Sequence, residues 1–229
     1  MRAANNRCRL ESCFNGFVLW VAFLTLLCSG CLFRKSSAAK TPSFRPSNVY
    51  RAGQKLPAEI RRVAVLPVSI EYGDWQAEES LKQLEPVLHT ELGKRKRFEL
   101  IMVAPEQLRQ WTGKGCWSAE EKLPIDLFER LQEALGCDAT LFSQLRPYHA
   151  YKPLVVGWNF KLVGAKNKSI LWSADEVFDA SEQTVANAAE DYYKGQAAGP
   201  AKDPSSVLMS PRRFSQFTLS AVLGTLPER

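Results

Sequence analysis

Residues 140–178 alternate apolar and polar side chains with a period of two, the pattern of strands that bury one face. In residues 154–162 the apolar positions are Leu154, Val156, Trp158, Phe160 and Leu162. Residues 164–168 are predicted to be a hairpin loop, and residues 169–178 return with Ile170, Trp172, Ala174 and Phe178 on one face. We therefore predict an antiparallel hairpin, preceded by a strand over residues 140–148.

Short apolar runs and helical periods alternate upstream of this hairpin. Residues 63–68 and 98–103 are apolar runs, and the first is typical of a strand buried on both faces. Leucines at three- and four-residue spacing from residue 81 predict a helix ending near residues 94–97, with Pro86 in its first turn or at a kink. Two further helices are predicted over residues 105–111 and 124–135. The second has Ile125 on its apolar face and Gly136 as a left-handed terminator.

Two helices are predicted towards the C-terminus, over residues 181–194 and 211–226. The predicted order is β-α-β-α-α-β-β-β-α plus a C-terminal helix, which indicates an α/β sandwich with a mixed β-sheet. Residues 57–229 are treated as a single α/β domain, because their length suits one core.

The first thirty-one residues have the order of a bacterial export signal. Basic residues precede an uncharged apolar run over residues 17–27, and Cys28-Ser29-Gly30-Cys31 follows. The run has the length of an export segment and is shorter than a membrane span. The arrangement resembles the bacterial lipobox, although Cys28 stands where Leu is usual. The resemblance implies that residues 1–30 are a signal peptide and that Cys31 carries a covalent diacylglycerol and an acyl chain such as palmitate.

The alternative for this segment is an uncleaved anchor, since the uncharged stretch continues through Phe33. Both alternatives place the rest of the chain outside the cytoplasm. Residues 31–56 contain the lipidated Cys31 and a segment rich in Ser, Pro, Lys and Arg, which we expect to be a flexible stalk.

The formal net charge of +6 is modest, and residues 1–30 contribute three Arg and one Glu to it. Such a charge suits an anionic surface such as lipid headgroups without demanding one. No aromatic residues are interleaved with the basic clusters, so a nucleic-acid partner is not expected.

Cys116 and Cys137 remain as an even pair after cleavage, in a compartment that permits disulfides. The sequence leaves two alternatives: a disulfide between them, or two separate buried thiols. Neither cysteine has a second Cys or a His at ligand spacing, so no metal is expected.

The sequence offers no recognisable catalytic set. His89 and His149 lack acidic or cysteine partners at ligand spacing, and the carboxylates, among them Asp74, Asp138 and Asp175, are scattered in a capping distribution. We therefore predict that the chain is not an enzyme and has no cofactor or small-molecule substrate.

Two segments are candidate interaction sites. Tyr148 and Tyr151 belong to an aromatic loop expected to be exposed, and Arg212, Arg213 and Phe214 begin the basic C-terminal helix. The alternative for the loop is a rigid turn in which the Tyr hydroxyls form hydrogen bonds with the backbone. The expected partner is an envelope protein or a second copy of the chain.

Several segments within residues 61–194 resemble a known family. They are Arg-Val-Ala-Val-Leu-Pro-Val at 62–68, Phe-Glu-Leu-Ile at 98–101, Gly136-Cys137-Asp138-Ala139, Leu171-Trp172-Ser173 and Asp191-Tyr192-Tyr193. Together with the export signal, they are similar to bacterial envelope lipoproteins of the CsgG, PelC and LpoB type. The resemblance also extends to a periplasmic lipoprotein family of this superfold without established activity.

This resemblance implies a three-layer α/β sandwich with a role in envelope assembly. The leading expectation is a non-enzymatic assembly or scaffold subunit of a cell-envelope complex. The alternatives are a ring-forming subunit of an export channel for curli or exopolysaccharide, and a regulator of a peptidoglycan-synthesis enzyme. We expect the chain to be lipid-anchored and to face the periplasm. By the rule of enterobacterial-type sorting, Leu32 after Cys31 favours the outer over the inner membrane if the source has both.

Overall fold

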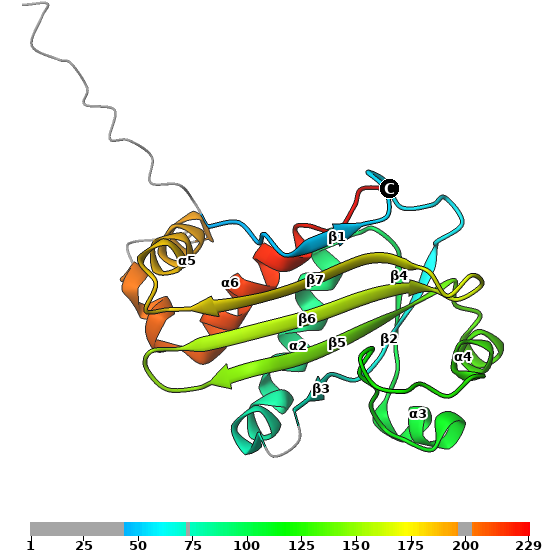
Figure 1. The fold of residues 1–229 in the computed structure, drawn as a ribbon. Helices are drawn as coiled ribbons and strands as arrows, with labels where there is room; N and C mark the ends of the chain where they lie inside the picture. Colours follow the sequence, from blue (N-terminus) through cyan, green and yellow to red (C-terminus); the bar gives the residue numbers. More distant parts are fainter. Residues whose placement is uncertain (1–43, 72–73, 197–202) are drawn as a thin grey trace, which may run out of the picture. The chain divides into compact units, whose positions relative to one another are not determined.

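A mixed β-sheet forms the centre of the fold in the computed structural model, which describes residues 44–71, 74–196 and 203–229 (Figure 1). The strand order is β1-β7-β6-β5-β2-β4, and β3 pairs with β5 outside this path. The strands are β1 (Val49–Arg51), β2 (Arg62–Val65), β3 (Ser69–Ile70), β4 (Glu99–Met102), β5 (Ala139–His149), β6 (Val155–Gly164) and β7 (Ile170–Asp179). Residues 1–43, and with them the expected signal peptide and Cys31, lie outside the described residues.

The antiparallel half of the sheet is the meander that the alternation predicted. β6 pairs with β5 on one side and with β7 on the other. The apolar positions predicted within residues 154–162 are all buried, and Trp158, Phe160 and Trp172 stack in sequence across the buried face. Ile170 is an exception, being 41% exposed, because a register shift after Leu162 takes it out of the alternation.

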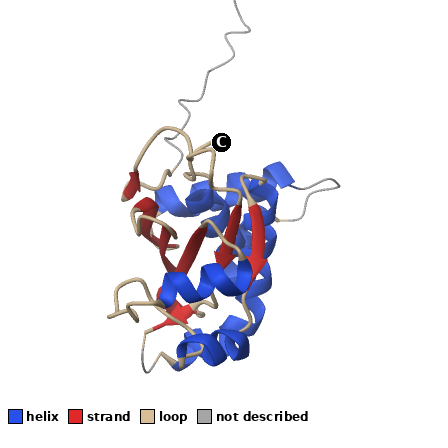
Figure 2. Cartoon of the chain, turned by 90° about the vertical axis from the view of Figure 1, so that its right-hand side faces the viewer, coloured by secondary structure: helices blue, strands red, loops and turns tan. Residues whose placement is uncertain are grey.

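The parallel half is built from β2, β4 and β5, with β2 between the other two. Helices connect these strands and cover both faces, and Figure 2 shows them on either side of the sheet. They are α2 (Trp75–Arg95), α3 (Pro105–Thr112), α4 (Leu127–Leu135), α5 (Gln183–Gln196) and α6 (Pro211–Leu223), with a 3₁₀ helix, η2 (Pro204–Met209), before α6. The three-layer α/β sandwich predicted from the sequence is thus the observed fold class.

The larger core lies between the sheet and the layer of α2, α5 and α6. Trp158 reaches α6, where its Nε1 donates to Thr218 Oγ1 at 2.9 Å. The smaller core lies on the opposite face, where α3 and α4 cover Ala64, Leu66 and Phe142. Within the described residues, every helix is too short or too polar to span a bilayer.

Two helix predictions need correction. Asp74 caps α2 by accepting from the Ala77 backbone at 3.0 Å, so the helix begins earlier than the leucine pattern suggests. Pro86 therefore lies inside the helix, which excludes the first-turn position and leaves the interior one of the two alternatives. Helix α4 begins at Leu127, so Ile125 precedes it and is 92% exposed. Gly136 ends α4 with a left-handed φ of 60°, as predicted.

The expected stalk also needs correction over residues 44–56, which belong to the domain. Phe44 packs against Phe178 with ring centroids 5.0 Å apart, and β1 pairs with β7. Leu56 is buried in the larger core, and its backbone nitrogen donates to Glu228 O at 2.7 Å. The polar composition of this segment gave no sign of the short edge strand β1. An edge strand is held by backbone hydrogen bonds, so it can form with few apolar side chains.

Candidate functional site

The sheet face that α3 and α4 cover is left open over β6, β7 and β1. Four polar side chains point to this face in the open part: Asn159, Lys161, Ser173 and Asp175. They line a shallow hollow of about 310 Å³, together with Tyr50 of β1 and Glu120 of the loop between α3 and α4. We call Gln144, Asn159, Lys161, Ser173, Asp175 and Glu120 the polar face.

A row of three polar side chains crosses this face from strand to strand. Gln144, Asn159 and Asp175 are register partners on β5, β6 and β7. Gln144 and Asn159 are buried, so their amides require partners. Asn159 Nδ2 donates to Asp175 Oδ2 at 3.1 Å, and Gln144 Oε1 accepts from Ser118 Oγ at 3.1 Å.

Glu120 joins the loop of residues 113–126 to this row. Its Oε1 accepts from Asn159 Nδ2 at 3.0 Å and lies 3.7 Å from Lys161 Nζ. Its Oε2 accepts from Arg146 Nη2 at 2.6 Å. The carboxylate thus meets two cations and an amide, which compensates its charge and holds the loop against the sheet.

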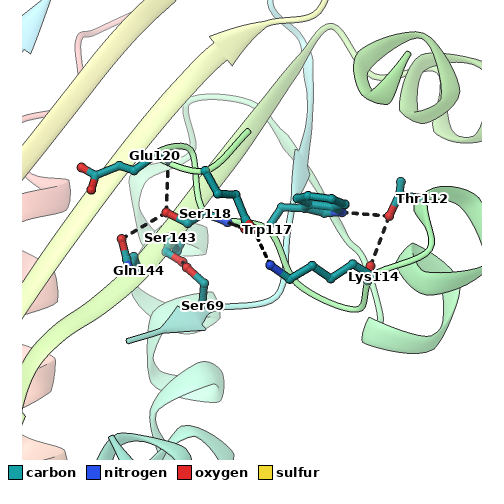
Figure 3. Close-up of polar contacts among 9 residues, drawn as sticks. Ser69, Thr112, Lys114, Trp117, Ser118, Glu120, Ser143 and Gln144 are labelled. Atoms are coloured by element: carbon teal, nitrogen blue, oxygen red, sulfur yellow. Dashed lines mark hydrogen bonds and ion pairs between the residues drawn. The ribbon is translucent and has the colours of Figure 1, made fainter. Parts of the chain in front are cut away.

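Polar contacts also hold the first part of this loop in place, as Figure 3 shows. Trp117 Nε1 donates to Thr112 Oγ1 at 2.8 Å, and Lys114 Nζ lies 4.9 Å from the Trp117 ring centroid. Ser118 also accepts at its Oγ from the Glu120 backbone at 3.2 Å. These contacts fix the position from which Glu120 reaches the sheet.

The polar face combines carboxylates that are engaged within the fold with exposed side chains at its edge. Both carboxylates, Glu120 and Asp175, already accept hydrogen bonds from neighbouring side chains. The open hollow has an exposed aromatic ring at its rim in Tyr50, and Val177 of β7 is exposed on the same face. Within the described residues, no group of three or more His, Cys, Asp or Glu side chains could hold a metal ion.

The expected interaction residues divide into buried and exposed ones. Tyr148 is 2% exposed because β5 continues through His149, and burial raises the pKa of its hydroxyl. Phe214 is fully buried in the larger core. The expectation that these two side chains are available to a partner is therefore wrong.

Tyr151 and Arg212 are exposed, as expected, in the β5–β6 turn and the first turn of α6. Arg213 is engaged within the fold, since its Nη1 donates to Ser206 Oγ at 3.0 Å and its guanidinium lies 5.2 Å from the Tyr193 ring centroid. The structure does not bring these residues to the polar face.

Cys116 and Cys137 are both free thiols, and no bridge joins them. Cys137 is buried, as the alternative of two buried thiols expected, whereas Cys116 is only half-buried. Burial is the largest cause that raises the pKa of each thiol. The groups around them differ: Lys114, Glu121 and Arg109 act on Cys116, and Asp138 and Thr140 on Cys137. The two cysteines therefore occupy separate environments.

One histidine and two carboxylates that the sequence singled out have defined surroundings in the structure. Burial lowers the pKa of His89, against the opposing effect of Glu85. Asp138 Oδ2 accepts from the Arg61 and Arg62 backbones, both at 2.9 Å, and so joins the beginnings of β2 and β5. Asp175 is an exception to the capping distribution, because it lies inside β7 and belongs to the polar face.

Sequence reasoning missed Glu120, Asn159 and Asp175 as a group. The alternation does assign Asn159 and Lys161 to the polar side of their strand. Nothing in the loop around Gly113 and Gly115 indicates that Glu120 folds onto a strand 39 residues away.

No protein-family model matches the chain, and no curated protein matches it in sequence. The chain is similar in fold to solved structures. One is the PelC dodecamer from Paraburkholderia phytofirmans, with 14% identity, a TM-score of 0.43, and coverage of 81% of this chain and 97% of that chain. Another is lipoprotein GNA1162 from Neisseria meningitidis, with 18% identity, a TM-score of 0.36, and coverage of 62% and 99%.

The LpoB C-terminal domain from Escherichia coli is also found, with 17% identity, a TM-score of 0.33, and coverage of 52% of this chain and 82% of that chain. PelC and LpoB are two of the three proteins whose type the sequence resembles. At these identities the similarity concerns the fold alone.

Proposed function

We propose that the chain is a non-enzymatic lipoprotein, tethered through Cys31, that acts as an assembly or scaffold subunit of a bacterial cell-envelope complex. The observation that carries this proposal is the polar face, an open hollow of the sheet lined by hydrogen-bonded and ion-paired side chains. Its charged groups are bonded to one another, and apolar side chains, Tyr50 and Val177, are exposed beside them. The partner is another envelope protein or a second copy of the chain.

The bonding of the polar face favours recognition over catalysis. A general acid or base must be free to exchange a proton with a substrate within hydrogen-bond reach. The Glu120 carboxylate is instead held by Arg146 and Lys161, and Asp175 by Asn159. Protein interfaces commonly combine a Tyr anchor with such a polar surround.

The chain between Cys31 and the domain is short enough to keep a lipid-anchored domain near its membrane. Thirteen residue steps separate Cys31 from Phe44, whose ring packs in the domain. A chain of that length spans at most about 45 Å. A domain held by a lipid on Cys31 would therefore stay close to its membrane, facing the periplasm, with the outer membrane favoured.

Site-specific crosslinking tests the interface. A photoreactive residue is placed in the full chain at Tyr50 or at Val177, and at Thr184 on α5 as an exposed control in the opposite layer. We expect irradiated cells to give a discrete crosslinked species from positions 50 and 177 and none from 184. Equal crosslinking at all three positions, or none at 50 and 177, would contradict the proposal.

Two alternatives put the same surface into other assemblies. In one, the chain forms a ring in an export channel, as a dodecamer is named for PelC. In the other, it regulates a peptidoglycan-synthesis enzyme. The elution size of the detergent-extracted protein separates a ring from a single copy, and the identity of the crosslinked species separates a second copy from a different protein.

A further inference from the structure

One end of the sheet collects cationic side chains from segments that are far apart in the sequence. They come from the loop before β2, the end of α2, the β6–β7 hairpin and the C-terminus. The hairpin and the loop before β2 lie at the right of Figure 1. The exposed members are Lys55, Arg61, Lys94, Lys96, Lys166 and Arg229, which we call the basic end.

Backbone contacts hold these segments together. Leu56 N donates to Glu228 O at 2.7 Å, which joins the loop before β2 to the C-terminal residues. Glu99 N donates to Arg61 O at 2.7 Å, and Ala52 N donates to Leu171 O at 3.0 Å. The basic end is thus a fixed feature of the fold.

Most of the positive charge at the basic end is not paired with a neighbouring acid. Glu99 pairs with Arg62 and Glu228 with Arg97, which leaves Glu59 as the exposed acid of the loop. Within the described part of the chain, Lys55, Arg61, Lys96, Lys166 and Arg229 form no ion pair; Lys94 pairs with Glu91.

The helix dipole accounts for only part of this cluster. Cations are favourable near the C-terminus of α2, which explains Lys94 and Lys96. Lys55, Arg61, Lys166 and Arg229 lie on loops or at the chain end, where no such benefit applies. An anionic surface that faced this end of the sheet would attract all four side chains.

We infer that the basic end docks on the anionic headgroups of a lipid membrane, an inference that rests on the proposed tether. Phe44, where the tether enters the domain, packs against Phe178 at the opposite end of β7. The eleven residues of β5 rise about 35 Å, and the tether spans at most about 45 Å, so the basic end can reach the same membrane. The tether also keeps the effective concentration of headgroups high, so a modest attraction is sufficient.

Vesicle binding tests this inference on residues 42–229, which form a compact unit containing both cores. The probes are vesicles of phosphatidylcholine, with and without phosphatidylglycerol, at low and high salt. We expect binding to the anionic vesicles alone and weaker binding at high salt.

The variant Lys55→Gln/Arg61→Gln/Lys166→Gln should reduce the partition coefficient by roughly fivefold per charge removed. The matched control, Lys82→Gln/Lys122→Gln/Arg212→Gln, removes the same charge from exposed positions outside the basic end and should stay within twofold of the original protein. Circular dichroism verifies that both variants fold.

Three results would overturn the inference: equal loss in both variants, equal binding to neutral vesicles, or binding to soluble polyglutamate without binding to anionic vesicles. The last would indicate an anionic polymer as the partner. None of these results concerns acylation of Cys31 or crosslinking from the polar face, so the proposed function stands or fails separately.

Discussion

Gly157 lies on β6 where the strand passes close to the backbone of β5. A Cβ at this position would lie 2.0 Å from Arg146 O and 2.6 Å from Arg146 C, so backbone would have to move. We expect Gly157→Ala to lower the free energy of unfolding by roughly 2–4 kcal/mol, measured by urea denaturation.

Gly93→Ala is the matched control for this change. Nothing lies within 4 Å of a Cβ at Gly93, which is inside α2, so alanine there should stabilise the fold by roughly 0.5–1 kcal/mol. If Gly157→Ala proved as stable as the original protein, this would contradict the close approach of β6 to the β5 backbone at Arg146.

The two free thiols predict a pH dependence of alkylation. Because burial raises the pKa of Cys116 and of Cys137, each carries less thiolate at a given pH than in the unfolded chain. We expect iodoacetamide to modify both more slowly in the folded than in the urea-unfolded full chain, with Cys137 the slower and both rates rising with pH. Peptide mass spectrometry after timed quenching measures each site, and a Cys116–Cys137 disulfide peptide would contradict the free thiols.

Residue patterns predicted the buried face of β6 and the left-handed Gly136, because both follow from local spacing. They did not reveal the burial of Tyr148, which depends on β5 continuing past the register shift after Leu145. Aromatic residues next to a Pro and a turn have the same local appearance whether they end a strand or belong to a loop.

At the scale of elements, residues 44–56 stabilise the domain through β1, Phe44 and Leu56. A chain that starts at Pro57 loses the β1 ladder and the burial of two apolar side chains. We expect it to be less stable than a chain that starts at Pro42 by at least about 3 kcal/mol. Equal denaturation midpoints for the two chains would mean that residues 44–56 do not stabilise the domain, as the predicted stalk implies.

The loop of residues 113–126 depends on Glu120 for its position on the sheet. In Glu120→Gln the ion pairs with Arg146 and Lys161 are lost, so we expect faster hydrogen exchange in this loop. Because the carboxylate is one-third exposed, the expected global destabilisation is only about 1 kcal/mol. Glu133→Gln, at an exposed position on α4, is the control, and equal exchange in both variants would argue against the role of Glu120.

Element order was predictable because each long strand or helix carries its own periodicity. The edge strand β1 and the short β3 were not, since so few residues give no period. The polar face depends on the docking of a loop across 39 residues of sequence between Glu120 and Asn159, which local patterns do not encode.

At the scale of the whole molecule, the proposed function joins a polar sheet face to a lipid tether. The three layers follow from the order of elements, and both cores lie in residues 42–229. The tether is a prediction from the basic start, the apolar run over residues 17–27 and Cys28-Ser29-Gly30-Cys31, which all lie outside the described residues. Its test is therefore independent of the polar face.

Intact mass and palmitate labelling of the native protein, beside Cys31→Ala, test the tether most directly. We expect the native chain to begin at Cys31, to carry the mass of the lipid and to incorporate the label. The Cys31→Ala variant should carry no lipid mass and incorporate no label. An unlabelled full-length chain in both samples would contradict the lipoprotein account and indicate an uncleaved anchor.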